Sequence, residues 1–287
     1  MSYAWQLQKD GKAEETIQTT ILRLKRLASL TDISDPEQVK AVLTSLNWKN
    51  STKRHVTVVY TGYLKHIGKT WNAPKYMKEK PLPFIPTEQE LDTLISAGRT
   101  KASAFLQLLK ETGARMGEAL RIQWIDIDEQ RRTIHISAEK GSNDRILPIS
   151  IRLIGMLNQL PKKSNRVFPT KKHSARTMFE KLRKRTAVKF SNPRINAIHL
   201  HTFRHWKGTM EYHKTRDIIR VKTILGHNSI TSTMIYINLE NAIFASDDNE
   251  YTCKATKDTT EATKLVEVGF QYVTTTPDGL VLFRKRK

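Results

Sequence analysis

A proline-rich stretch, "KEKPLPFIPT" at residues 78–87, constrains the fold more than any other part of the sequence. Three prolines fall within six positions there, and proline fixes its own φ angle, removes a backbone donor and restricts the residue before it. Such a stretch cannot lie inside a helix, so we expect an extended linker over residues 79–86. The linker separates a first domain at residues 1–78 from a second at 87–245, and a short appended segment follows at 246–287.

The first domain has the pattern of a small helical domain. Apolar residues such as Ile17 and Leu24 recur at three-to-four spacing, which is typical of amphipathic helices. The stretch "SDPE" at 34–37 predicts the start of a helix that Ser34 caps, with proline in its first turn. A further helix is predicted to end at Gly68.

The second domain is predicted to be mainly α-helical around a small β-hairpin. Thr87 and Glu90 form a capping box for its first helix, and Gly113 ends the next. The apolar pattern then changes from helical to alternating, and "KGSND" supplies turn residues before "RILPI", which indicates a hairpin. A basic helix over 172–190 and three short helices over 202–236 complete the domain. The appended segment is predicted to form strand, helix, strand, a Pro-Asp-Gly turn and a last strand.

The net charge indicates a polyanionic partner. Lys and Arg total 49 against 28 Asp and Glu, which gives a formal charge of +21, and such an excess is typical of proteins that bind nucleic acid or acidic surfaces. DNA, RNA and acidic membranes all fit this charge. No apolar run approaches the roughly 18 residues that a transmembrane helix needs, and the first residues lack a signal-peptide pattern. We therefore expect a cytoplasmic protein that faces nucleic acid.

The cysteine and histidine patterns argue against metal chemistry. Cys253 is the only cysteine, which excludes an internal disulfide and a thiolate metal cluster. The nine histidines show no H-E-x-x-H pattern, the arrangement that many zinc hydrolases use. A metal-dependent nuclease is disfavoured, and we expect neither a metal nor another cofactor.

Four short stretches of the second domain carry residues that suit phosphodiester chemistry. They are "TGARMGEAL" with Arg115, "AEKGSNDRILPI" with Lys140, "HLHTFRHW" with His201 and Arg204, and "LGHNSITSTMIY" with His227 and Tyr236. Each is ordinary alone, but in this order and spacing they resemble the tyrosine recombinase (phage integrase) family over about residues 87–240. Phe203 stands where the family's H-x-L-R pattern usually has Leu, and as an apolar residue it should fill the same core position.

The resemblance implies that DNA is cleaved without a metal. Arg115 and Arg204 would clamp the scissile phosphate, because the arginine fork matches phosphate geometry and stays charged. His201, near the start of a predicted helix, and His227 would face the same phosphate. Lys140, on the hairpin turn, would protonate the leaving oxygen.

The resemblance also makes Tyr236 the nucleophile, which would form a 3′-phosphotyrosyl link that stores the bond energy for rejoining. A short helix from about Ser229 to Tyr236 is predicted to place it. Two residues are expected in supporting roles: Glu118, which would orient Arg115, and His205. Whether Tyr236 acts in its own protomer or in a neighbour is left open.

Simpler roles compete with these when each residue is taken alone. A lone tyrosine most often fills a core, and a lone arginine or lysine is most often a solvated surface charge. The joint order of the motifs is what favours catalysis. Further basic residues are candidate DNA contacts, against the competing interpretation of a solvated basic face: Lys53, Arg54, Lys65 and Lys69 in the first domain, and Lys171, Lys172 and Arg176 at the start of the basic helix.

By the same resemblance, the fold class is mainly α with a small sheet: a helical, SAM-like core-binding domain and an α+β integrase-type catalytic domain that close as a clamp on duplex DNA. The implied function is site-specific recombination, for integration or excision of a mobile element or for dimer resolution. A homotetramer on two DNA sites is implied, with a monomer or dimer off DNA. Two alternatives stay open, a type IB topoisomerase-like relaxation activity and a catalytically inactive DNA-binding regulator. The appended segment is similar to tails of archaeal members, and we expect it to contact a neighbouring protomer or DNA.

Overall fold

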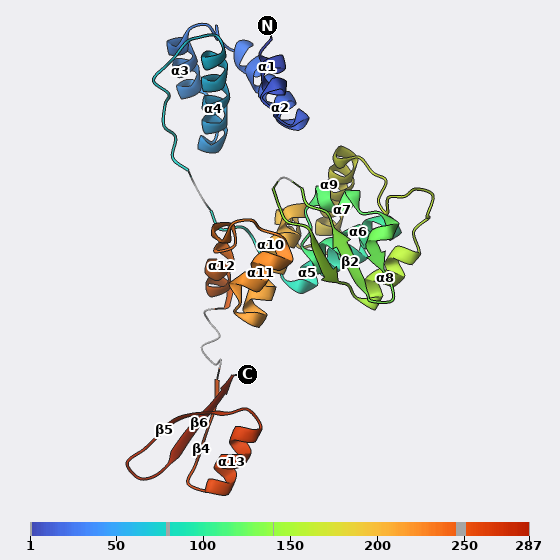
Figure 1. Cartoon of the computed structure of the whole chain (residues 1–287), viewed down its shortest axis with the longest axis vertical. Coiled ribbons are helices and arrows are strands. Elements are labelled where there is room, and N and C mark those ends of the chain that lie inside the picture. The colour runs from blue at the N-terminus through green and yellow to red at the C-terminus, as the bar shows by residue number, and fades with distance from the viewer. Residues whose placement is uncertain (1, 79–80, 140, 245–250, 287) are drawn as a thin grey trace. The chain divides into compact units, whose positions relative to one another are not determined.

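The computed structural model describes residues 2–78, 81–139, 141–244 and 251–286. The chain divides into two compact units, Met1–Pro81 and Leu82–Lys287, and Figure 1 shows their helices and strands. The units are described separately below.

The first unit is a helical bundle. Its helices are α1 (Tyr3–Lys9), α2 (Glu14–Ala28), α3 (Pro36–Ser45) and α4 (Asn50–His66). Their apolar faces meet in one core, in which Leu27, Val39, Leu43, Tyr60 and Leu64 are fully buried. The helical prediction for this part of the chain is confirmed, although the short α1 was not foreseen.

The predicted cap of α3 is wrong by one residue. Asp35, not Ser34, is the N-cap, and its carboxylate accepts hydrogen bonds from the backbone N–H groups of Glu37 and Gln38. The Ser34 hydroxyl instead donates to Asp32 at 2.8 Å. Aspartate and serine are comparable caps, so the sequence alone could not decide between two adjacent candidates.

The second unit is a larger helical core with a small sheet on it. Its helices are α5 (Glu88–Ser96), α6 (Thr100–Thr112), α7 (Met116–Arg121), α8 (Ile151–Asn158), α9 (Lys172–Lys189), α10 (Leu200–Thr215), α11 (Ile218–Leu225) and α12 (Ile235–Phe244), and three 3-10 turns lie between them at Trp124–Asp126, Pro193–Ala197 and Ile230–Ser232. Helix α6 is buried along most of its length and packs against α5, α8 and α10. Phe203 of α10 is fully buried in this core, as predicted.

The predicted boundaries of the first two helices of this unit are confirmed. The Thr87 hydroxyl accepts from the Glu90 N–H at 3.2 Å, and the Glu90 carboxylate accepts from the Thr87 N–H at 2.8 Å. Gly113 ends α6 in the left-handed conformation with φ of 63°, which glycine adopts without strain. The chain can therefore turn sharply into the segment that carries Arg115.

The two strands of the predicted hairpin are the central strand and one edge strand of a three-stranded antiparallel sheet. Strands β1 (Ile127–Asp128), β2 (Thr133–Ile136) and β3 (Arg145–Pro148) lie in that order. Ile134 and Ile136 are fully buried, as the alternating pattern predicted. One face of β2 therefore packs on the helical core.

The C-terminal segment has the predicted order of elements. Strand β4 (Tyr251–Thr256), helix α13 (Thr259–Glu267), β5 (Gln271–Thr275) and β6 (Val281–Arg286) form an antiparallel sheet in the order β4-β6-β5 with one helix. Leu265 and Phe283 form its small core. The turn before β6 is closed by a hydrogen bond from the Thr276 N–H to the Leu280 carbonyl at 2.9 Å.

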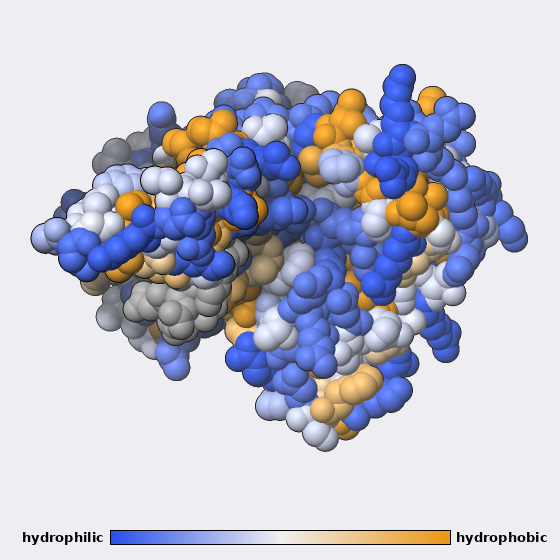
Figure 2. Space-filling view, turned by 90° about the horizontal axis from the view of Figure 1, so that it is seen from below, coloured by the Kyte–Doolittle hydropathy of each residue, from blue (hydrophilic) through white to orange (hydrophobic). Residues whose placement is uncertain are grey.

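The face drawn in Figure 2 is mainly hydrophilic, with hydrophobic residues in small, separate patches. Over the described ranges, no helix combines the length and hydrophobicity that a lipid bilayer would require.

Candidate active site

Arg115 is fixed by a carboxylate one turn along the chain. It is the N-cap of α7, and its backbone N–H donates to Glu118 Oε2 at 2.8 Å while its Nη1 donates to Oε1 at 2.9 Å. The Arg115 side chain remains 27% exposed, whereas that of Glu118 is fully buried. Glu118 therefore holds the Arg115 side chain in one position while part of the guanidinium group stays exposed.

Glu118 also receives two groups that sequence reasoning did not single out. Arg145 Nη2 donates to Oε2 at 2.7 Å, and the Ser142 hydroxyl donates to Oε1 at 2.8 Å. Burial disfavours the charged carboxylate, but the bonds from Arg145, Arg115 and Ser142 outweigh it and lower the pKa of Glu118 to about 2. The hairpin is thereby joined to α7 through one ionised side chain. The sequence did hold one indication of this role: Arg145 is the first residue of strand β3, at a position where the alternating pattern points inward.

Arg204 on α10 bridges the ends of two other helices. It is only 1% exposed, with Nη1 donating to the Gly113 carbonyl at 2.9 Å and Nη2 to the Leu225 carbonyl at 2.5 Å. Burial and the neighbouring Arg115 lower the pKa of Arg204 to about 10, so it stays charged at neutral pH. The ends of α6 and α11 are therefore held around this guanidinium group.

Three histidines surround the two arginines. The rings of His201 and His205 meet edge to face at 4.8 Å, as residues four apart on one helix can. Loss of solvation and the nearby His205 and Arg204 lower the pKa of His201 to about 4. Burial and Arg204 also lower the pKa of His205. Around neutral pH these rings are uncharged and can offer one N–H donor each.

His227 is positioned by a glycine turn and by Thr233. It follows Gly226, which ends α11 with φ of 64°, and its Nδ1 lies 2.9 Å from the Thr233 hydroxyl. Burial, Arg204 and Arg115 lower the pKa of His227 to about 3. This contact leaves Nε2 of His227 for another partner.

Tyr236 lies inside this group of residues. It is 1% exposed, and its ring is nearly parallel to that of His227 at 6.3 Å and lies 6.1 Å from that of His205. Burial raises the pKa of Tyr236 to about 12, while Arg204 and Arg115 act in the opposite direction. The buried Tyr236 therefore keeps its proton at neutral pH, and the positive charges of Arg204 and Arg115 offset part of the effect of burial.

Tyr236 does not end a helix that starts at Ser229, so that prediction is wrong. Ser229 caps only a single 3-10 turn, Ile230–Ser232, and a new helix, α12, begins at Ile235. The helical conformation is interrupted between them at Thr233, which is fully buried and whose hydroxyl lies within hydrogen-bonding distance of His227. Tyr236 thus stands in the first turn of α12.

Gly208 is a further residue that the sequence did not identify. It lies in the interior of α10, and a Cβ atom there would come within 2.5 Å of Tyr236 Cζ and 2.6 Å of Cε1. Only glycine lets the tyrosine ring lie this close to the helix backbone. The contact joins residues 28 positions apart, and helical periodicity carries no information about it.

The loop that carries Lys140 is tied to the turn that carries His227. Lys140 itself lies outside the described residues, so its predicted place is not determined. Beside it, the Asn228 side chain donates to the Gly141 carbonyl, and the Asn143 N–H donates to the Gly226 carbonyl at 3.1 Å. Two segments far apart in sequence therefore meet at the site.

The candidate DNA-contacting residues differ in whether their side chains already bond to other groups of the protein. In the first unit, Lys53 donates to the Thr44 carbonyl at 3.4 Å and Lys69 to the Ser34 carbonyl at 3.0 Å. Lys65 is exposed and Arg54 is half-buried. In the second unit, Lys171 and Arg176 are exposed, and Lys172 forms an ion pair with Glu139 at 2.9 Å.

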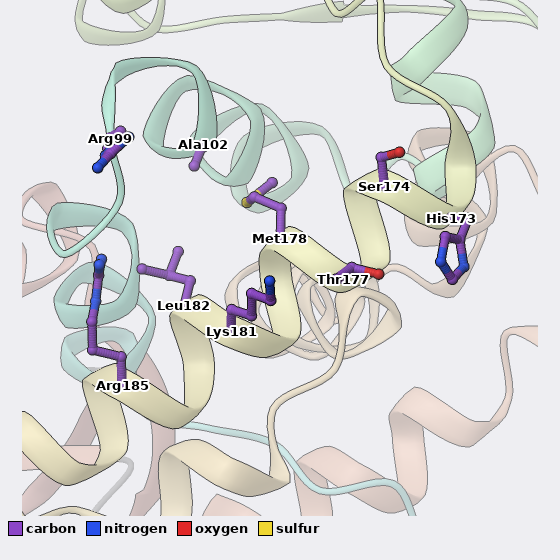
Figure 3. A pocket seen from close by; sticks show the side chains of 9 residues that line it. All are labelled: Arg99, Ala102, His173, Ser174, Thr177, Met178, Lys181, Leu182 and Arg185. Atoms are coloured by element: carbon purple, nitrogen blue, oxygen red, sulfur yellow. The ribbon is translucent and has the colours of Figure 1, made fainter.

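A cavity of about 620 Å³ lies between α9 and the start of α6. Figure 3 shows Arg99 from the segment before α6, and Lys181 and Arg185 from α9, around an apolar floor that includes Met178 and Leu182. Sequence reasoning missed Arg99, which stands apart from any basic cluster. Within the described parts of the chain, no three His, Cys, Asp or Glu side chains are grouped so as to hold a metal ion.

Known proteins are similar to this chain in sequence and in fold. The tyrosine recombinase of Thermosipho africanus is 27% identical over 194 residues, which cover 63% of this chain and 68% of the relative. For the tyrosine recombinase XerA of Saccharolobus solfataricus the identity is 24%, covering 67% of this chain and 64% of the relative. XerA of Pyrococcus horikoshii is 24% identical over 284 residues, covering 92% of this chain and 93% of the relative.

The fold matches solved structures of the same kind. XerH bound to a difH substrate superposes with a TM-score of 0.60 at 20% identity, over 86% of this chain and 84% of that one. A lambda integrase dimer bound to a core site superposes with a TM-score of 0.64 at 16% identity, over 82% of this chain and 92% of that one. The model of the phage integrase family matches residues 86–242, more than half of the chain, and the protein described here belongs to that family.

Proposed function

We propose that this chain is a site-specific DNA recombinase that cleaves and rejoins DNA through a 3′-phosphotyrosyl link to Tyr236. The observation that carries this proposal is the burial of Tyr236 beside Arg115, Arg204 and His227 within one chain. A tyrosine that served only as core filling would not need two arginines and a neutral histidine at its edge. Membership of the phage integrase family supports the same role.

The proposed reaction uses the arrangement as follows. Arg115 and Arg204 bind the non-bridging oxygens of the scissile phosphate and stabilise the charge that develops in the transition state. His201 and His227 add neutral N–H donors to that phosphate. The Tyr236 oxygen loses its proton and attacks the phosphorus, and the 5′ oxygen of the DNA leaves and takes up a proton. Attack by a 5′ hydroxyl on the phosphotyrosine then reverses the step and joins the strands.

Lys140 is proposed as the donor of the proton to the leaving oxygen. Its neighbours Gly141 and Asn143 are hydrogen-bonded to the turn that carries His227, which supports this role. Lysine is a suitable donor because it is charged at neutral pH and reaches far on a flexible stem.

Duplex DNA is proposed as the substrate, in keeping with a formal charge of +21. XerH, which shares this fold, has been crystallised with its difH substrate. We expect Lys171, Lys172 and Arg176 at the start of α9 to contact phosphates. We expect the basic residues around the cavity in Figure 3, which are Arg99, Lys181 and Arg185, to contact phosphates as well.

We also propose that four copies act on two DNA sites for complete strand exchange, and that the protein acts in the cytoplasm. Integration or excision of a mobile element and resolution of dimers both use this chemistry.

A covalent-capture assay tests the proposal. Nicked duplexes tiled across the genomic neighbourhood of the gene are incubated with protein in excess chelator and scored for a denaturant-resistant adduct. The adduct should form with wild type and with Tyr212→Phe, a control on α10 whose ring packs on the same small core as Tyr236, and should vanish in Tyr236→Phe. Tight binding without any adduct would favour an inactive regulator. Plasmid relaxation without exchange between two DNAs would favour a topoisomerase-like activity.

A further inference from the structure

A second buried residue of α12 connects the nucleophile helix to α10. Glu240 lies one helical turn after Tyr236 and is only 2% exposed. Its Oε1 lies 2.9 Å from His213 Nδ1, and its Oε2 accepts a hydrogen bond from Arg216 Nη1. A carboxylate this buried is stable only when it is paired, so these contacts fix where α12 lies.

Contacts between the two helices recur on three successive turns of α12. Tyr236 lies against Gly208, Glu240 meets His213 and Arg216, and the ring of Phe244 stacks on that of His213 at 3.8 Å. Figure 1 shows α10 and α12 side by side. Of these contacts only the one to Glu240 includes an ion pair, and charge-assisted hydrogen bonds are stronger than neutral ones. The Glu240 contact therefore adds a strong polar anchor between α12 and α10.

The backbone at Arg216 supports this interpretation. Arg216 ends α10 in the left-handed conformation with φ of 53°, which glycine adopts without strain and a long side chain such as arginine adopts only with strain. The strained residue is the one whose guanidinium group meets Glu240. Backbone strain that persists beside a functional group is often part of how that group is held.

We propose that Glu240 is a positioning residue for the reaction: its buried pairing with His213 and Arg216 fixes α12 on α10 of the same chain and so commits Tyr236 to its own active site. This inference rests on the proposed role of Tyr236 as the nucleophile. Glu240 itself does not touch the DNA. It acts by holding the tyrosine oxygen at one distance from the phosphate that Arg115 and Arg204 bind.

The chain offers a matched control for the test. Glu211 on α10 is also nearly buried and also pairs with two cations, Lys207 at 3.3 Å and Arg220 at 2.8 Å, but these lie on α10 and α11. Glutamine at either position keeps the size of the side chain and leaves no buried charge. The partners of Glu240 are partly exposed, at 40% for His213 and 30% for Arg216, so water can solvate them and Glu240→Gln should fold.

The first measurements are hydrogen exchange of the α12 amides and single-turnover adduct formation on the nicked duplexes. In Glu240→Gln, exchange of residues 235–244 should accelerate at least about tenfold, because a charge-assisted hydrogen bond is lost. Adduct formation should slow by roughly ten- to a hundredfold, the scale of an ångström-sized misplacement, with DNA affinity unchanged. Glu211→Gln should match wild type in both. Unchanged exchange or an unchanged cleavage rate in Glu240→Gln would overturn the proposal.

A mixing experiment tests the assignment of Tyr236 to its own site. Arg115→Ala and Tyr236→Phe proteins are combined on one duplex, so that an adduct can form only if a tyrosine enters the site of a neighbour. We expect no adduct, and restored cleavage would refute donation within one chain. If wild type itself forms no adduct on any duplex, the proposed function fails, whereas the exchange measurement still decides whether Glu240 anchors α12.

Discussion

Gly208→Ala should separate the activity of this protein from its stability. The added Cβ would lie 2.5 Å from Tyr236 Cζ and 2.6 Å from Cε1, whereas carbon atoms rest at about 3.5–4.0 Å. The ring must therefore move by about 1 Å or more, away from the backbone of α10. A misplacement of that size in a reacting group costs roughly a hundredfold in rate.

The effect on stability should be much smaller, because two contributions oppose each other. Overpacking a buried contact costs about 1–3 kcal/mol, while replacing glycine in a helix interior gains about 1 kcal/mol. A net loss of roughly 0–2 kcal/mol in the free energy of unfolding is expected from denaturant titration. Adduct formation is measured in the same preparation.

Gly155→Ala provides the control for this prediction. Gly155 lies inside α8, with no atom within 4 Å of the added Cβ, so this change should raise stability by about 0.5–1 kcal/mol and leave cleavage unaltered. If Gly208→Ala cleaves DNA as fast as wild type, the argument that Gly208 makes room for the nucleophile is wrong.

Three further predictions address other parts of the molecule. Burial lowers the pKa of His227 to about 3, so below pH 6.5 the unfolded chain binds more protons than the folded one. The free energy of unfolding should therefore fall by about 2 kcal/mol from pH 7 to pH 5. In urea unfolding, His227→Gln should lose this part of the pH dependence, and a profile identical to that of wild type would contradict the burial argument. Arg204→Lys should lower the free energy of unfolding, measured in urea, by about 1.5–3 kcal/mol, because one ammonium group cannot replace the two guanidinium nitrogens that donate to the Gly113 and Leu225 carbonyls. A free energy of unfolding equal to that of wild type would show that these bonds are dispensable. Removing residues 250–287 should weaken assembly or DNA affinity in sedimentation and binding assays, and unchanged values would reject a contact by that segment.

The sequence predicted those features that depend on local residues. The capping box at Thr87, the glycine end of α6, the buried alternation of Ile134 and Ile136, and the order of elements in the C-terminal segment all follow from short-range rules. The family resemblance rested on motifs of this local kind. Local rules were least reliable where two candidates were adjacent, as at Ser34 and Asp35.

The features that were missed depend on contacts between distant segments. Gly208 looks like an unfavourable residue inside a helix until Tyr236 is placed against it. Arg145 looks like a surface charge until Glu118 is buried beneath it. Glu240 looks like an ordinary polar residue of α12 until the end of α10 supplies its partners. In each case the partner lies more than 20 residues away, and no periodicity in the chain encodes such a pairing.

The break before α12 agrees with local propensity. The stretch from Ser229 to Tyr236 holds two serines, two threonines and two isoleucines, which are weak helix formers. The buried contact between Thr233 and His227 adds a tertiary partner at the same place.

Direct identification of the DNA-linked residue tests the central claim most closely. The covalent adduct is trimmed with nuclease and digested with trypsin, which leaves residues 223–254 as one peptide, since no Lys or Arg lies between Lys222 and Lys254. Fragmentation in a mass spectrometer should place the remaining nucleotide on Tyr236. A nucleotide on Tyr251 of the same peptide, or on any residue of another peptide, would contradict the account.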